Sequence, residues 1–225
     1  TNSWSKRRLS EAAKYNEERK LQVVKGDLLG DISGLCEGVD VVVNFAAKTF
    51  VDHSIRDPLP FVMSNTVGTV NLLEEARKQK VKAFLQVSTD EVYGEILKGQ
   101  HTEESPLQPR NPYAAAKAGA DAFALSYAHS FGMWTCVTRT ENNYGPWQHW
   151  QKAIPRFIGK ALRNEELPIY GDGQHVRQWL HVDDHVEAIN TLITDGWEGQ
   201  KAQSGEGFHV AGAQELTNLE LAKLL

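Results

Sequence analysis

The chain has 225 residues, of which 41% are hydrophobic and 24% are charged, and its formal net charge is −5. This composition is ordinary for a globular protein that buries a core. The acidic balance argues against a general binder of nucleic acid or of anionic membranes, and no apolar run reaches membrane-spanning length. Only Cys36 and Cys136 are present, without metal-ligand spacing, which fits a reducing cytoplasm and predicts no metal site.

Strands and helices are predicted to alternate along the first part of the chain. A β-branched run at 39–45 suits a strand buried on both faces of a sheet. Alternation of this kind predicts right-handed β-α-β units, and hence an α/β fold with a doubly wound parallel, Rossmann-like sheet. In chain order, the predicted elements are a polar helix at 6–19, strands at 21–25 and 39–45, a helix at 60–79, a strand at 83–88, a helix at 112–131 and a strand at 134–139.

The pattern changes after Gly145-Pro146. A helix is predicted at 152–164 and a strand at 178–182, and Asp183 is the expected N-cap of the helix that follows. The polar, glycine-containing stretch 196–207 is predicted to be a surface loop. The last residues, 217–225, have the pattern of a further helix.

Polar and small residues follow the predicted strands at the point where each one ends. Asp27 follows the first strand, Ala46-Ala47 the second, Thr89-Asp90-Glu91 the third and Asn142-Asn143 the fourth. Ligands of doubly wound sheets bind at the carboxyl ends of the strands. We therefore expect these residues to share a single site.

Tyr113 and Lys117 are four residues apart on a predicted helix, so their side chains share one face. An ammonium group beside a phenol favours the phenolate, which would lower the pKa of Tyr113 and let it act as a base near neutral pH. Alone, such a pair is more often a solvated helix face. Here it closely follows the carboxylates of Asp90 and Glu91, which favours a catalytic role.

Asp90 and Glu91 are adjacent at a strand end. Two carboxyl groups in different environments can hold different protonation states, one as an acid and one as a base. Taken alone, the dipeptide is more often part of a polar loop. His181 and His185, with the aspartates between them, resemble a metal cluster only superficially, because they fit a strand end and a helix start.

These motifs resemble the extended short-chain dehydrogenase/reductase family, and within it the nucleotide-sugar 4,6-dehydratases. Tyr-x-x-x-Lys is typical of the whole superfamily. Thr-Asp-Glu before Val-Tyr-Gly is much more specific, because related epimerases and decarboxylases carry other residues there. The matching stretches run in the family's order along nearly the whole chain: 26–28, 44–47, 51–52, 65 with 68–69, 88–94, 113–117, 142–146 and 168–185.

The resemblance implies a reaction that uses NAD on dTDP-glucose or a related nucleotide sugar such as UDP-glucose. Tyr113 would take the proton of the sugar 4-hydroxyl while hydride passes from C4 to NAD. Lys117 would hold the nicotinamide ribose, and Thr89 would hydrogen-bond to the 4-oxygen. Glu91 would then remove the C5 proton as Asp90 protonates the departing 6-hydroxyl. Return of the hydride to C6 would give a 4-keto-6-deoxy sugar.

The resemblance also implies the binding residues. The implied cofactor contacts are Asp27, Leu28, Ala46, Ala47, Ser88, Tyr113 and Lys117. The implied substrate contacts are Thr49, Thr89, Asn142, Lys152, Tyr170 and Arg177. Of these, Asn142, Lys152 and Arg177 carry side chains that suit phosphate groups, although each alone is more often an ordinary surface residue.

The chain departs from the family pattern in two places. It contains no Gly-x-Gly-x-x-Gly. We therefore expect an incomplete NAD-binding domain over 1–146, without the first β-α unit, and a partial sugar-nucleotide lobe over 147–225 that interleaves with the last sheet elements. In addition, Lys48-Thr49-Phe50 stands where the family usually has Glu-Ser-His, which leaves the identity of the sugar nucleotide open.

Three functions remain open at this point. The first is a 4,6-dehydratase. The second is another enzyme of the extended family, an epimerase or decarboxylase, against which Asp90 and Glu91 argue. The third is a non-catalytic module that keeps the fold, which the missing glycine motif favours. The resemblance also implies a cytoplasmic homodimer paired through helices 60–79 and 112–131.

Overall fold

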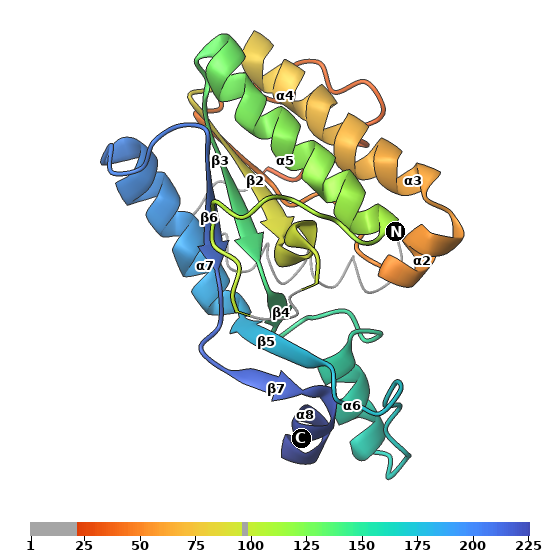
Figure 1. Cartoon of the computed structure of the whole chain (residues 1–225). Helices are drawn as coiled ribbons and strands as arrows, with labels where there is room; N and C mark the ends of the chain where they lie inside the picture. The colour runs from red at the N-terminus through yellow and green to blue at the C-terminus, as the bar shows by residue number, and fades with distance from the viewer. Residues whose placement is uncertain (1–21, 96–98) are drawn as a thin grey trace.

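A computed structural model describes residues 22–95 and 99–225 (Figure 1), so the predicted helix at 6–19 lies outside the described residues. Its centre is a four-stranded parallel sheet in the order β1-β2-β3-β6. The strands are β1 (Val41–Asn44), β2 (Ala83–Thr89), β3 (Trp134–Thr140) and β6 (Glu206–Val210). The prediction of an α/β fold with a parallel sheet is confirmed.

Helices cover both faces of this sheet, as a doubly wound fold requires (Figure 1). On one face, α4 (Gly68–Lys78) and α5 (Pro112–Phe131) pack against the strands in a core that includes Leu73, Phe84 and Val137. On the other face, α7 (Val182–Thr191) contributes Ile189 to a cluster with Leu85 and Cys136. The central strands β2 and β3 are therefore buried on both sides.

The amino-terminal edge of the described sheet differs from the prediction. In β1 only Asn44 is buried, because β2 is the one described strand beside it. The prediction of burial on both faces at 39–45 is therefore wrong. Residues 22–25 form no strand and are exposed, so the strand predicted at 21–25 is wrong over its described part. Without a partner ladder, an apolar run does not become a strand.

The helix predicted at 60–79 is present but is not a regular α-helix. It runs as α3 (Leu59–Phe61), a π-helical segment η1 (Val62–Val67) and then α4. Asn65 is buried in η1, where its Oδ1 accepts from the Lys48 backbone N–H at 2.7 Å and its Nδ2 donates to the Lys48 carbonyl at 3.0 Å. The π-helical segment thus fixes the loop that leaves β1 and enters α2 (Val51–Arg56).

The α5 helix has the predicted bounds, and its two ends explain why. Pro112 occupies the first turn, where its missing N–H costs nothing, and Asn111 caps the helix by accepting from the Ala114 N–H at 2.8 Å. Gly132 ends the helix in the left-handed conformation, with φ of 66°.

A second, three-stranded sheet lies beyond the carboxyl ends of the first (Figure 1). In it, β4 (Asn142–Tyr144) runs parallel to β5 (Val176–His181), which pairs antiparallel with β7 (Glu215–Thr217). Two helices flank this sheet, α6 (Ala153–Ala161) and α8 (Asn218–Leu224).

Several predictions for this region need correction. The helix predicted at 152–164 is present but shorter, since α6 runs only from Ala153 to Ala161. His181 rather than Asp183 caps α7, since its Nδ1 accepts from the Asp183 N–H at 3.3 Å. The stretch 196–207 is not wholly a loop: it begins inside the π-helical segment η3 (Leu192–Glu198) and ends in β6.

None of the described helices combines the length and the apolar character that crossing a bilayer demands. The described residues bring no three or more His, Cys, Asp or Glu side chains together in a way that could hold a metal ion.

Candidate active site

The catalytic residues predicted from the sequence meet where β2 ends. Thr89 is the last residue of β2, and its hydroxyl accepts from the Glu91 N–H at 3.3 Å and lies 3.1 Å from Asp90 Oδ1. Asp90 and Glu91 then form the start of a short 3₁₀ helix, η2 (Asp90–Tyr93). Tyr113, in the first turn of α5, hydrogen-bonds to Thr89 and lies within electrostatic range of both carboxylates.

Two residues that were not predicted from the sequence hold Glu91 and the start of α5 in place. Asn111 caps α5 with its Oδ1, while its Nδ2 donates to Glu91 Oε2 at 2.8 Å, so one side chain links the helix start to the carboxylate. Ser54 of α2 accepts from the Tyr113 backbone N–H at 3.1 Å. Asparagine before proline is a recognisable cap signal, but nothing in the sequence indicates the contact to Glu91.

The pKa of Tyr113 shifts in the direction opposite to the prediction. Its side chain is buried, and burial together with the carboxylates of Glu91 and Asp90 raises the pKa of the phenol. Lys117 is not among the groups that shift this pKa, and its ammonium donates to the Val87 carbonyl at 2.5 Å. The prediction that Lys117 lowers the pKa of Tyr113 is therefore wrong for this arrangement of side chains.

Lys117 belongs to a buried line of charges that extends away from Tyr113. Burial lowers the pKa of Lys117 to about 8, and the carboxylate of Asp121, one turn further along α5, opposes that shift. Asp121 forms an ion pair with Arg139 at 3.2 Å, and Arg139 donates to the Tyr93 hydroxyl at 2.9 Å. Ser88, the predicted cofactor contact, is buried beside Asp121.

Asp90 and Glu91 occupy different environments, as an acid and base pair requires. Burial, and then the carboxylate of Glu91, raise the pKa of Asp90, although the Thr89 hydroxyl and the nearby Arg177 act against the shift. Glu91 instead accepts the hydrogen bond from Asn111. Asp90 is therefore better suited to carry a proton, while the side chain of Glu91 is oriented by Asn111.

Two predicted substrate contacts lie close to this pair of carboxylates. Lys152 is the N-cap residue of α6, and its ammonium donates to the Thr49 carbonyl at 3.3 Å and lies within electrostatic range of Glu91. Arg177 is exposed on β5 and lies within electrostatic range of Asp90. Each cation therefore interacts with one of the two carboxylates.

Two further predicted substrate contacts, Asn142 and Tyr170, also lie in the second sheet and its surroundings. Asn142 donates to the Gln178 carbonyl at 3.4 Å. Tyr170 is 69% exposed, and its hydroxyl accepts from Arg156 at 3.3 Å. Neither side chain has a described bond to Asp90, Glu91 or Tyr113.

The other predicted cofactor contacts lie in two segments: Asp27 and Leu28 follow a stretch that forms no strand, whereas Ala46 and Ala47 follow β1. Asp27 uses its Oδ1 to accept from the Leu29 N–H at 3.0 Å, which shapes a local turn. Leu28 packs against the core beneath α4. Ala46 lies two residues after the end of β1, and its N–H donates to Asn44 Oδ1 at 3.1 Å; the next residue, Ala47, is half-buried.

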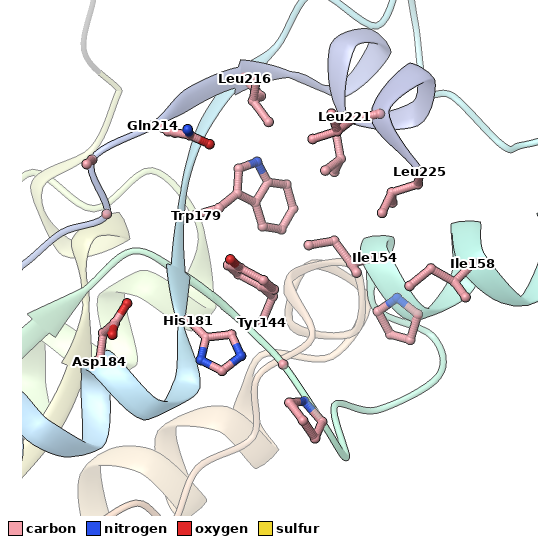
Figure 2. Close-up of a pocket in the computed structure, with 16 residues that line it drawn as sticks. Tyr144, Ile154, Ile158, Trp179, His181, Asp184, Gln214, Leu216, Leu221 and Leu225 are labelled. Carbon is pink, nitrogen blue, oxygen red and sulfur yellow. The ribbon is translucent and has the colours of Figure 1, made fainter.

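A separate apolar pocket of about 650 Å³ lies in the second sheet region (Figure 2). Figure 2 shows the rings of Trp179 and Tyr144 turned toward it from β5 and β4, with Leu221 of α8 on its far side. None of the predicted site residues lines it. The lining residues are Tyr144, Gly145, Pro146, Ile154, Pro155, Ile158, Trp179, His181, Asp184, Gly212, Ala213, Gln214, Leu216, Leu221, Leu224 and Leu225.

Comparison with known proteins points to one family of sugar-nucleotide enzymes. The chain is 44% identical over 210 residues to the low-salt glycan biosynthesis protein Agl12 of Haloferax volcanii, covering 92% of this chain and 66% of that protein. It is also 44% identical over 219 residues to a dTDP-glucose 4,6-dehydratase of an Actinoplanes species, covering 96% and 67%. The chain thus spans about two thirds of the length of these relatives.

Solved structures agree with the sequence comparison. A dTDP-glucose 4,6-dehydratase from Streptomyces venezuelae, crystallised with NAD bound, superposes with a TM-score of 0.89 at 41% identity, over 96% of this chain and 66% of that one. A UDP-glucuronic acid 4-epimerase from Bacillus cereus has a TM-score of 0.88 at 27% identity, over 98% and 70%. The family described as GDP-mannose 4,6 dehydratase matches residues 1–225. The chain therefore belongs to the GDP-mannose 4,6 dehydratase family.

Proposed function

We propose that this chain carries the active site of an NAD-dependent nucleotide-sugar 4,6-dehydratase that acts on dTDP-glucose or a related nucleoside-diphosphate glucose. The observation that carries the proposal is the pair Asp90 and Glu91, held in different environments next to Tyr113. Removal of water across C5 and C6 needs one carboxyl group to take a proton and another to give one.

In this proposal each residue of the pair has one proton to move. Glu91, oriented by Asn111, takes the C5 proton of the sugar. Asp90, whose pKa is raised, gives its proton to the departing 6-hydroxyl. Tyr113 and Thr89 contact the 4-oxygen, and Tyr113 as the phenolate takes the proton of the 4-hydroxyl. Because the pKa of Tyr113 is raised, its phenol must first lose its own proton to solvent.

The residues at the edge of the sheet fit NAD. When bound, NAD supplies a hydride acceptor and, once reduced, a hydride donor. Lys117 has three N–H donors, of which the structure engages one on Val87, so others can reach ribose hydroxyls. Ala46 and Ala47, just after β1, have small side chains that would leave room for the cofactor, and Ser88 lies on the neighbouring strand β2. Asp27 and Leu28 would then hold the adenine end.

The cations near Asp90 and Glu91 suit the diphosphate of the substrate. Lys152 and Arg177 would pair with phosphate oxygens, with Thr49, Asn142 and Tyr170 completing the contacts to the nucleotide sugar. We also propose that residues 1–146 form the NAD-binding unit and 147–225 the sugar-nucleotide lobe. The second sheet supports a separate lobe, and the return of β6 to the first sheet supports the interleaving of this lobe with the last sheet elements.

We infer a cytoplasmic homodimer for the working protein. Large apolar side chains are exposed along the adjoining helices α3, η1 and α5, and they would be buried if two copies paired there: Leu59, Val62, Met63 and Phe123. A single exposed apolar residue needs no explanation, but a group on neighbouring helices favours an interface.

A non-catalytic module that keeps the fold but binds NAD weakly is the second candidate, and the presence or absence of bound NAD distinguishes it from the dehydratase. A 4-epimerase is less well supported, because C4 epimerisation uses no acid and base pair at C5 and C6.

The experiment incubates the purified protein with NAD and dTDP-glucose and follows the alkaline absorbance of a 4-keto product. Mass spectrometry of the supernatant after denaturation tests for released NAD. Formation of the 4-keto-6-deoxy sugar supports the dehydratase. Binding of NAD with interconversion of C4 epimers would favour the epimerase, and absence of both NAD and product would favour the non-catalytic module.

A further inference from the structure

Phe50 and Lys152 join two parts of the chain that are far apart in sequence. Phe50 precedes α2 in the loop that leaves β1, and Lys152 precedes α6. The Lys152 ammonium lies 4.7 Å from the centre of the Phe50 ring and donates to the carbonyl of the neighbouring Thr49 at 3.3 Å. The loop between β1 and α2 therefore holds the Lys152 ammonium at the start of α6.

This cation has no carboxylate partner within ion-pair distance among the residues that the structure describes. Burial lowers the pKa of Lys152, and the more distant Glu91 opposes that shift. A partly desolvated ammonium over an aromatic face is attracted by the negative potential of the ring. The ring of Phe50 thus stabilises a positive charge that no anion of the described chain neutralises directly.

The Phe50 ring is itself held in place by other aromatic rings. His53 of α2 lies 5.2 Å from it, centre to centre, and His149 meets it edge-on at 5.6 Å and 77°. His149 stacks in turn with Trp150 at 5.9 Å. His53 and His149 thus hold the Phe50 ring with one face toward Lys152.

We propose that Phe50 is a positioning residue that holds the Lys152 ammonium ready to receive the diphosphate of the nucleotide sugar. This inference rests on the proposed function, in which Lys152 contacts that diphosphate. Phe50 acts through Lys152 and needs no contact with the ligand. A positioned ammonium binds an anion more tightly because less side-chain freedom is lost on binding.

Calorimetric titration with thymidine diphosphate and uridine diphosphate tests the proposal. Phe50→Leu keeps an apolar side chain of similar size but removes the aromatic face. It should weaken diphosphate binding about threefold to tenfold, which corresponds to about 0.7 to 1.4 kcal/mol. Phe50→Tyr keeps the face and should bind within about twofold of the parent protein.

A double-mutant cycle separates positioning from general packing. In a Lys152→Met background, Phe50→Leu should cause no further loss of diphosphate binding, since the cation that it positions is gone. An equal loss in both backgrounds would overturn the proposal, as would unchanged binding by Phe50→Leu in the parent protein. In turnover, Phe50→Leu should raise KM and leave kcat near the parent value.

The outcomes also distinguish this inference from the function on which it rests. If the parent protein binds neither diphosphate, the proposed function fails and the inference fails with it. If the parent binds a diphosphate and Phe50→Leu binds it equally well, only the role of Phe50 is refuted.

Discussion

The two halves of the candidate site differ in how far they are buried. The half built by β2 and α5 is closed: Tyr113 is 9% exposed, Lys117 4% and Asp121 0%. The half built around the second sheet is open, and Tyr170 there is 69% exposed. Burial shifts protonation equilibria and strengthens electrostatic interactions, whereas an open surface lets a ligand enter and leave. The molecule thus separates the groups that would move protons from the groups that would bind phosphate.

The largest expected effect tests the buried half. Glu91→Gln should reduce exchange of the sugar C5 proton by about a hundredfold to ten-thousandfold, because a neutral amide cannot accept that proton. Proton nuclear magnetic resonance of the substrate in D₂O measures the exchange, and a melting curve checks the fold. Glu104→Gln, on an exposed loop, is the matched control. Unchanged exchange in the Glu91 variant would remove this residue from the reaction.

The next effect concerns stability in the same half. Asp121→Asn leaves the buried guanidinium of Arg139 without its counterion, so the free energy of unfolding should fall by about 3 to 5 kcal/mol. Urea denaturation measures the change. Asp40→Asn breaks the exposed pair with Lys82 and should have a much smaller effect, because water screens that pair. Equal losses in the two variants would show that burial does not distinguish these ion pairs.

A smaller effect is expected in the open half. Arg177→Gln should raise KM for the nucleotide sugar about tenfold while kcat changes little, since an exposed cation contributes mainly to binding of the diphosphate. Steady-state kinetics separates the two constants. Arg163→Gln removes an exposed cation that pairs with Glu165, and it should leave KM unchanged. A loss confined to kcat would place Arg177 in the chemical step instead.

The smallest effect lies at the boundary between the halves, at Glu141 after β3. Burial raises the pKa of Glu141 to about 7, with Asp90 and Glu215 adding to the shift and the Gly212 N–H opposing it. The folded protein therefore binds more protons than the unfolded chain between about pH 4.5 and 7, so stability falls as pH rises through that range.

Glu141→Gln should remove this pH dependence. Relative to the parent, the variant should gain about 1 kcal/mol between pH 5 and pH 8, less than the full shift implies because the side chain is partly exposed. Urea denaturation at both pH values measures the gain, with exposed Glu187→Gln as the control. A gain of equal size at both pH values would mean that ionisation of Glu141 does not cause the pH dependence.

The sequence predicted the central elements well where local signals and tertiary context agree. Pro112 and Gly132 mark the ends of α5, and the apolar runs of β2 and β3 are long enough to identify buried strands. It missed β6, whose residues 206–210 begin in a polar, glycine-containing stretch. That strand forms because the edge of β3 offers it a ladder partner, which is a property of the fold rather than of the segment.

The sequence indicates that Asp90, Glu91 and Tyr113 lie near one another, but it does not indicate their electrostatics. Helical spacing places Tyr113 and Lys117 on one face, yet it does not show that Lys117 reaches back to the Val87 carbonyl. Nor does it show how deeply Tyr113 is buried, which decides the direction of its pKa shift. The contact between Asn111 and Glu91 spans two elements, so no local pattern could have indicated it.

The π-helical segment η1 also makes the site sensitive to the length of the chain. A π-helical turn closes its hydrogen bond over one more residue than an α-helical turn does. Each residue of an α-helix rotates the chain by about 100° about the helix axis. Removing a single residue from Val62–Val67 would therefore rotate Asn65 away from Lys48 or turn the face of α4 off the sheet. In this segment a one-residue deletion would be far more damaging than most substitutions, although it lies outside the catalytic residues.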